Sequence, residues 1–156
     1  MDAQAGFEIV LPYPPSTNEL WEPDVVRSHA GRPIGAMRLT AKARKYKTDV
    51  GWLLKKAGVR KPITGRVAIE GTLHPKLPLD ARERMRKFGD AWEDSVRCID
   101  IDNARKVVFD ALKGIAFVDD RFVWDDHFRR GEPLATPCLR IRIRAIPYHI
   151  PQMELL

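Results

Sequence analysis

Residues 98–115 read CIDIDNARKVVFDALKGI, and this stretch decides the second half of the fold. Apolar residues recur at every third or fourth position after Asp102, a spacing that predicts an amphipathic helix over 102–115. Gly114 marks the end of this helix, because glycine is typical of helix C-termini. The predicted inward face consists of Ala104, Val107, Val108, Ala111, Leu112 and Ile115.

Two carboxylates stand where this helix begins. If residues 99–101 are extended, Asp100 and Asp102 lie on the same side of the chain, with Cα atoms roughly 7 Å apart. Carboxylates held this close repel each other unless a cation lies between them, and hard ions such as Mg²⁺ prefer oxygen ligands. Asp102 could also cap the first backbone N–H groups of the helix.

A lysine and a further pair of acids follow these two carboxylates along the chain. Lys106, four residues after Asp102, could steady a carboxylate or a phosphate oxygen, and a turn at Asp119-Asp120 could return a third carboxylate to the same end of the helix. Three acids and a lysine suffice for metal-assisted hydrolysis of a phosphodiester. The same residues equally fit a structural role in the helix dipole, in an ion-pair ladder from Asp102 through Lys106 to Asp110, or in a turn.

The rest of the chain predicts alternating strands and helices. Another helix, rich in basic residues, is predicted over 41–57, with Thr40 as its N-cap. Residues 19–33 are predicted to form a polar loop. Residues 79–97 are predicted to form a charged insert made of a helical turn and a mobile loop. The strands cover 7–11, 34–39, 67–72, 122–128 and 138–146, and a hairpin loop at 129–133 joins the last two. This order predicts an α+β fold of two layers, with a mixed sheet and two main helices on one face.

Charge and composition narrow the class of protein. The 156 residues include 27 Lys and Arg against 21 Asp and Glu, and this net charge of +6 attracts polyanions such as nucleic acid. Apolar residues make up 44% and charged residues 31%, which is typical of a folded globular protein and argues against disorder. No apolar run approaches the ~20 residues that cross a bilayer. Cys98 and Cys138 are not expected to form a disulfide, which fits a reducing compartment. Since the N-terminus also lacks the pattern of a secretory signal, a cytoplasmic location is predicted.

Basic side chains gather in the insert and in the last predicted strand. Arginines alternate with apolar residues over 139–144, so they repeat every ~6.6–6.8 Å, close to the spacing of phosphates along a DNA strand. As a structural alternative, these arginines could protect a sheet edge from pairing with another chain. Likewise, the lysines of helix 41–57 could form a solvated face with no role in binding. The side chains predicted to bind DNA are Arg82, Arg84, Arg86, Lys87, Arg97, Arg140, Arg142 and Arg144.

Two stretches together resemble a known family. The chain resembles the RusA-type Holliday junction resolvases, which are common in prophages. The resemblance is carried by LPYPPSTN at 11–18, with Trp21 after it, and by DIDNARKVVFDALKGIAFVDD at 100–120. The resemblance covers most of one predicted domain, 1–156, apart from the insert and the C-terminal tail at 147–156. It implies that Asp100, Asp102 and Asp120 bind Mg²⁺, or Mn²⁺ in its place, that Lys106 is catalytic, and that Asn18 and Asn103 support the active site.

The resemblance also implies a homodimer that nicks opposing strands of a four-way junction symmetrically, which suits a two-fold enzyme on a two-fold substrate. Relatives often carry several arginines directly before the first acid, whereas residues 95–99 here read SVRCI, so this role is expected to pass to residues 82–87. The expected function is Mg²⁺-dependent resolution of Holliday junctions in recombination and repair. A branched or flap DNA nuclease of phage replication or packaging, and a non-catalytic DNA-binding protein, are the alternatives.

Overall fold

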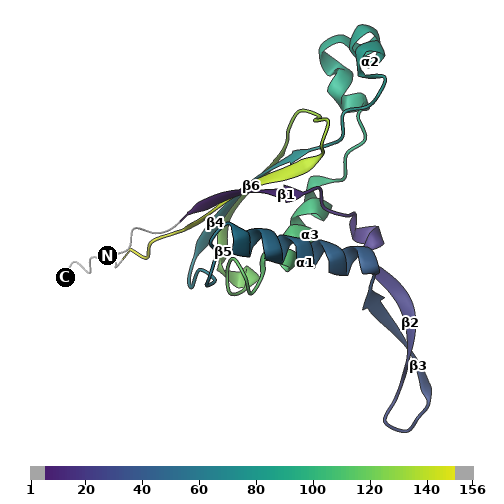
Figure 1. Ribbon diagram of the computed structural model, residues 1–156, viewed down its shortest axis with the longest axis vertical. Coiled ribbons are helices and arrows are strands. Elements are labelled where there is room, and N and C mark those ends of the chain that lie inside the picture. Colours follow the sequence, from purple (N-terminus) through teal and green to yellow (C-terminus); the bar gives the residue numbers. More distant parts are fainter. Residues whose placement is uncertain (1–5, 150–156) are drawn as a thin grey trace, which may run out of the picture.

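The main β-sheet has four strands in the computed structural model, which describes residues 6–149 (Figure 1). Its order is β1-β6-β4-β5, where β6 is antiparallel to both neighbours and β4 is parallel to β5. The sheet is therefore mixed, as predicted. The strands are β1 (Phe7–Pro12), β4 (Val67–His74), β5 (Val123–Arg130) and β6 (Cys138–Ala145).

Two helices, α1 (Ala41–Lys56) and α3 (Ile101–Leu112), cover one face of this sheet (Figure 1). Thr40 caps α1 as predicted, since its hydroxyl accepts a hydrogen bond of 3.1 Å from the Ala43 N–H. The apolar faces of both helices pack against alternate residues of the strands, and these side chains form a single core. The predicted α+β fold with two layers is confirmed.

The last two strands do not form the predicted hairpin, because β4 lies between them. After β5 the chain crosses the end of β4, where the Gly131 N–H donates to the Leu73 carbonyl and the Leu134 N–H donates to the Pro75 carbonyl. It then enters β6 in the middle of the sheet. The alternative interpretation of the arginines in 139–144 as the protection of a sheet edge is therefore wrong, since β6 has a partner on each side.

The predicted polar loop over 19–33 is also wrong in part. A short 3₁₀ helix, η1 (Thr17–Glu19), leads into β2 (Trp21–Arg27), which pairs with β3 (Pro33–Leu39) in a separate sheet of two strands. This β2–β3 hairpin projects away from the main sheet (Figure 1). Apolar and polar residues alternate over Trp21–Val25, but Pro23 lies inside this run and neither face of β2 is buried, so the strand was not predicted. Pairing with β3 supplies its hydrogen bonds.

The predicted helical turn in the insert is present, but helix also occupies most of the segment that was predicted to be a loop. The insert extends away from the sheet on the far side of α3 from the hairpin (Figure 1). It contains α2 (Ala81–Phe88) and a 3₁₀ helix, η2 (Gly89–Ser95). Arg84 fixes the two pieces together, since its guanidinium pairs with the Asp80 carboxylate at 2.8 Å and donates to the Ser95 carbonyl at 2.6 Å. Of the predicted tail at 147–156, residues 150–156 lie outside the described part of the chain.

Candidate active site

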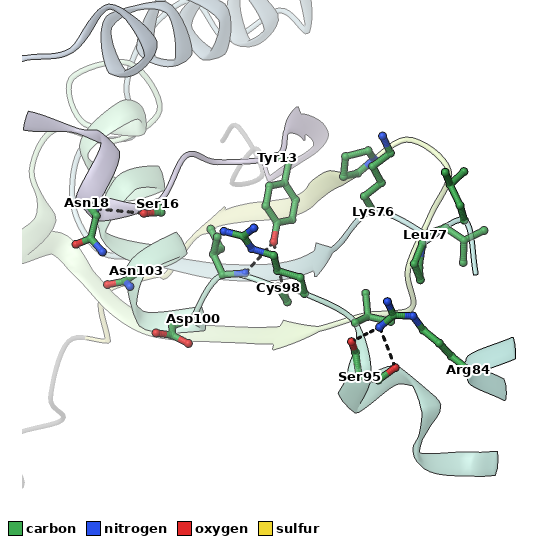
Figure 2. Close-up of a pocket in the computed structure, with 16 residues that line it drawn as sticks. Tyr13, Ser16, Asn18, Lys76, Leu77, Arg84, Ser95, Cys98, Asp100 and Asn103 are labelled. Carbon is green, nitrogen blue, oxygen red and sulfur yellow. Dashed lines mark hydrogen bonds between the residues drawn. The ribbon is translucent and has the colours of Figure 1, made fainter. Parts of the chain in front are cut away.

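A groove with a volume of about 730 Å³ lies at the start of α3 (Figure 2). The proline-rich loop at 12–18 forms one wall, and residues 95–100 form the opposite wall. Asp100, Asn103 and Asn18 all line this groove, although they come from distant parts of the sequence. The resemblance implied that these three residues share one site, and the structure brings them together at this groove. Cationic side chains, Lys76, Arg84 and Arg97, complete its lining.

Tyr13 joins the two walls of the groove (Figure 2). Its hydroxyl accepts a hydrogen bond of 3.0 Å from the Ile99 N–H and donates to the Cys98 sulfur at 3.5 Å. Burial and the Cys98 contact together raise the pKa of Tyr13 to about 12, so the hydroxyl stays neutral at ordinary pH. The residue beside Asp100 is thereby tied to the proline-rich loop. Sequence reasoning missed Tyr13, because nothing in the spacing of residues 13 and 99 signals a contact.

Asp100, rather than Asp102, occupies the N-cap position of α3, which corrects the predicted cap. Its backbone carbonyl accepts the first helical hydrogen bond, from the Ala104 N–H at 2.9 Å. Its exposed carboxylate makes no capping hydrogen bond within the described chain, so its oxygen atoms are free to bind a ligand in the groove. Because the helix begins at Ile101, the extended geometry expected for residues 99–101 ends before Asp102.

Asp102 lies in the first turn of α3 between two cationic side chains. Lys106 Nζ is 2.6 Å from one carboxylate oxygen, and an Arg105 guanidinium nitrogen is 3.0 Å from the other. The hydrogen bond from Lys106, followed by that from Arg105, lowers the pKa of Asp102. The predicted support of Asp102 by Lys106 is therefore present. The ion-pair ladder does not continue, since Asp110 pairs with Lys47 at 3.6 Å instead.

Arg105 links Asp102 to a second acid that the sequence analysis missed. Its other nitrogen is 3.2 Å from the carboxylate of Asp126, which lies on β5. Asp126, and then Asp102, raises the pKa of Arg105. The spacing of three residues between Asp102 and Arg105 signals their pairing. Asp126 gives no such signal, because its position depends on how β5 runs beside α3.

Asp120 lies at the opposite end of α3 from the paired acids. It begins a 3₁₀ helix, η3 (Asp120–Phe122), and its carboxylate is 3.8 Å from Lys113 Nζ, directly after the last turn of α3. Eleven residues separate Asp102 from Lys113, a rise of about 16 Å along the helix. The prediction that the chain returns this acid to the start of the helix is wrong, because β5 begins at the C-terminal end of α3.

Within residues 6–149, no three or more His, Cys, Asp or Glu side chains lie close enough together to hold one metal ion. Ligands of one Mg²⁺ lie about 2.1 Å from the ion, so the separation of Asp120 from Asp100 and Asp102 prevents a shared site inside a single chain. Of the three predicted ligands, Asp100 lines the groove, Asp102 follows in the first turn of α3, and Asp120 lies at the far end of that helix.

The predicted DNA-binding residues fall into three groups. Arg97 and Arg84 line the groove, although Arg84 is already bonded to Asp80 and Ser95. Arg82, Arg86 and Lys87 are exposed on α2. Arg140, Arg142 and Arg144 lie on the face of the sheet opposite the helices, because they alternate with the buried residues of β6. Two of this last group pair with acids, Arg142 with Glu8 at 3.6 Å and Arg144 with Asp125 at 3.7 Å.

A free carboxylate in a groove lined by cationic side chains is suited to binding a cation beneath a polyanion. The chain matches the family described as Endodeoxyribonuclease RusA over residues 12–144, which is most of its length. It therefore belongs to the RusA endodeoxyribonuclease family, and the predicted resemblance is confirmed. No match was found among curated proteins. Within residues 6–149, every helix is too short or too polar to cross a membrane.

Proposed function

We propose that the chain is a Mg²⁺-dependent, structure-specific endodeoxyribonuclease that resolves Holliday junctions by paired nicks during recombination and repair in the cytoplasm. The observation that carries this proposal is Asp100, an acid with a free carboxylate beside Asn18 and Asn103 in a cationic groove. Membership of the RusA family supports the choice of DNA as substrate. We expect Mn²⁺ to substitute for Mg²⁺, because both ions prefer carboxylate oxygen ligands.

The residues at the start of α3 fit a hard divalent cation. Mg²⁺ is usually held by one or two carboxylates together with substrate phosphate and water, and Asp100 and Asp102 supply the carboxylates. When bound, the ion would polarise a phosphoryl oxygen and lower the pKa of the attacking water. Lys106, followed by Arg105, lowers the pKa of Asp102 further below its usual value, so its carboxylate is ionised wherever the metal could bind. Arg97 and Lys76 would hold phosphates along the groove, and the amides of Asn18 and Asn103 would orient them.

A second copy of the chain supplies Asp120 in this proposal. Since Asp120 lies beyond the far end of α3, it can join Asp100 and Asp102 only if it comes from another molecule. A two-fold axis near the middle of α3 would oppose the start of one helix with the end of its partner, and so form two equal sites. Two equal sites are what paired, symmetric nicking of a four-way junction requires.

Mixing two inactive variants tests this arrangement. Asp100→Asn and Asp120→Asn should each abolish junction cleavage, because each substitution removes one metal ligand from both sites of the homodimer. After subunit exchange, a heterodimer carries one site with both substitutions and one site with neither, so about a quarter of the wild-type sites return. The product should be a junction nicked on one strand rather than a resolved one. Mixing Asp100→Asn with Asp102→Asn is the matched control, and it should restore nothing.

The junction-cleavage assay also tests which DNA structure the protein cuts and whether cutting requires a metal ion. Wild-type protein should cut a four-way junction in Mg²⁺ and leave it intact in EDTA, with a flap and a duplex cut far more slowly. Equal cutting of flap and junction would make the protein a general branched-DNA nuclease. The absence of any metal-dependent cutting would refute the proposal, and failure of complementation in proven heterodimers would refute the shared site alone.

A further inference from the structure

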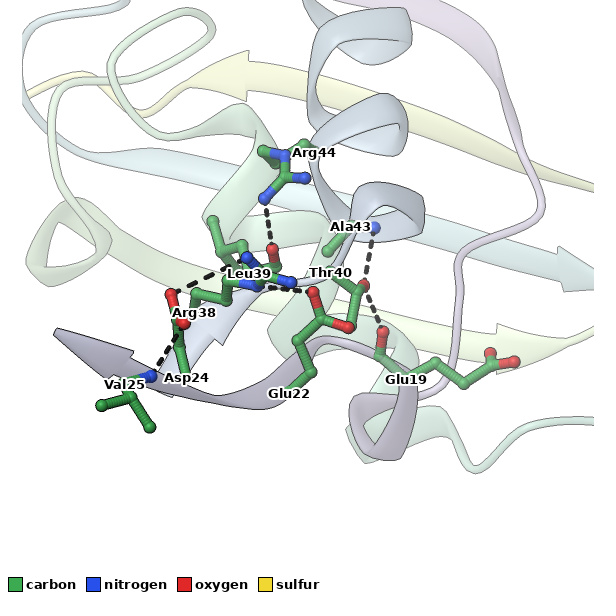
Figure 3. Close-up of polar contacts among 9 residues, drawn as sticks. All are labelled: Glu19, Glu22, Asp24, Val25, Arg38, Leu39, Thr40, Ala43 and Arg44. Atoms are coloured by element: carbon green, nitrogen blue, oxygen red, sulfur yellow. Dashed lines mark hydrogen bonds and ion pairs between the residues drawn. The ribbon is translucent and has the colours of Figure 1, made fainter. Parts of the chain in front are cut away.

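The β2–β3 hairpin is anchored at its base by hydrogen bonds, and its outer half projects away from the main sheet (Figures 1 and 3). At the base, Thr40 donates its hydroxyl to the Glu19 carbonyl at 2.6 Å, and Arg44 donates to the Leu39 carbonyl at 2.6 Å. Both donors belong to the start of α1, so the hairpin is held against the body of the protein. Beyond this anchor its two strands pair only with each other.

One face of the hairpin exposes large apolar side chains. Trp21, Val25 and Met37 share this face because of strand alternation and register, and they are 52%, 68% and 59% exposed. A hairpin of two strands is only marginally stable in water by itself, and contiguous exposed apolar residues mark an interaction site. The hairpin therefore has the surface of an element that is covered in use.

The charges of the hairpin indicate which partner covers it. Its two acids, Glu22 and Asp24, lie near the base and pair with Arg38 at 2.8 Å and 3.8 Å (Figure 3). From residue 25 to the end of β3 the sequence contains no acid, while Arg27 and Arg32 stand at either side of the turn. The outer half is consequently apolar and cationic, which favours a polyanion with apolar surfaces between its charges.

The position of the hairpin connects it to the candidate active site. Asn18, which lines the groove, belongs to η1, and β2 begins only two residues after η1 ends. A DNA strand seated at Asp100 and Asn18 therefore leaves the groove beside the base of the hairpin. Strands of seven residues extend about 24 Å, and a ribbon of two strands fits a DNA major groove about 12 Å wide.

We infer that the β2–β3 hairpin is a DNA-binding arm that lies along a groove of the duplex leaving the active site. Arg27 and Arg32 contact phosphates, and the face formed by Trp21, Val25 and Met37 covers sugars and base edges. The inference rests on the proposed function only in requiring that the chain bind DNA. It adds an interaction surface outside the cleavage site.

The salt dependence of binding tests the two arginines. In EDTA, where no cleavage occurs, the affinity for a labelled four-way junction is measured by fluorescence anisotropy over a range of salt concentrations. Each phosphate contact contributes about 0.9 to the slope of log K against log salt, so Arg27→Ala/Arg32→Ala should reduce this slope by about 1.8 for each hairpin that contacts the junction, or about 3.6 for a homodimer that uses both. The matched control, Arg60→Ala/Lys61→Ala, removes the same charge beyond the opposite end of α1 and should leave the slope almost unchanged.

A second variant tests the arm as a whole. Residues 25–35 are replaced by Asn-Gly, which joins the paired residues Asp24 and Ala36 through a tight turn. None of the deleted residues belongs to the core, so the thermal midpoint should remain that of wild type. The affinity for the junction should fall at least tenfold, while the molar mass from light scattering stays the same.

Each outcome decides the inference. Unchanged affinity and slope in both variants would overturn it, provided that wild-type protein binds the junction. A fall in molar mass with the deletion would also overturn it, since the hairpin would then be a contact between copies of the chain. If wild-type protein itself binds no DNA, the proposed function fails and the inference fails with it.

Discussion

Replacing Tyr13 by phenylalanine removes the hydroxyl that joins the proline-rich loop to the segment before Asp100, and we expect a loss of stability of about 1–2 kcal/mol. The Ile99 N–H donates to this hydroxyl over 3.0 Å at a half-buried position. A hydrogen bond contributes about 1 kcal/mol net, and the N–H left without a partner raises the cost. In a chain of this length each kcal/mol moves the thermal midpoint by about 2–4 °C, so the midpoint should fall by about 2–8 °C.

Thermal unfolding followed by circular dichroism measures this loss, and Tyr46→Phe is the matched control. The Tyr46 hydroxyl donates to the Pro12 carbonyl at 3.3 Å, a longer bond that leaves no N–H orphaned when it is removed. We therefore expect a smaller loss from this variant. Tyr13→Phe should also raise the Mg²⁺ concentration needed for half-maximal cleavage, because Asp100 follows Ile99. A Tyr13→Phe protein with the wild-type thermal midpoint would refute the reasoning. It would show that packing of the ring, and not the hydrogen bond of the hydroxyl, supplies the contribution of Tyr13 to stability.

Three further changes have defined outcomes. Thr40→Ala should cost about 1 kcal/mol in urea unfolding because it removes the cap of α1, whereas Thr40→Ser should cost little. Gly71→Ala should cost about 1–3 kcal/mol, since its Cβ would lie 2.7 Å from the Phe128 ring; unchanged stability would show that this ring moves freely. Lys106 lowers the pKa of Asp102, so Asp102 stabilises the fold above its unfolded pKa, and this contribution is lost as the pH falls through its lower folded value. Lys106→Met should raise the Asp102 pKa in an NMR titration, and an unmoved pKa would assign the shift to Arg105.

Local patterns predicted both main helices well. The cap at Thr40 and the apolar spacing of α1 and α3 depend on residues within a few positions of each other, so the sequence contains the whole signal. The alternation in β6 likewise predicted a strand with one buried face. These patterns were sufficient for the fold class, because an amphipathic helix and a one-sided strand must pack against each other.

Pairing between distant elements could not be predicted in the same way. The register of β5 beside β4 puts Asp126 near Arg105, and the start of β5 leaves Asp120 at the far end of α3. Neither position follows from spacing along the chain. β3 was predicted over 34–39, but β2 was missed for another reason, because Pro23 interrupts the strand pattern and neither face of β2 is buried.

The central position of β6 has a consequence for biosynthesis. β1 emerges first from the ribosome, yet its neighbour in the sheet is β6, which appears only after residues 13–137 have been translated. At about 5–20 residues per second this delay is on the order of 10 s. Until β6 is made, β1 lacks its partner in the sheet, and one edge of β4 also stays unpaired once β4 has been translated. A chaperone that shields unpaired strands would therefore act on this protein before its last strand is made.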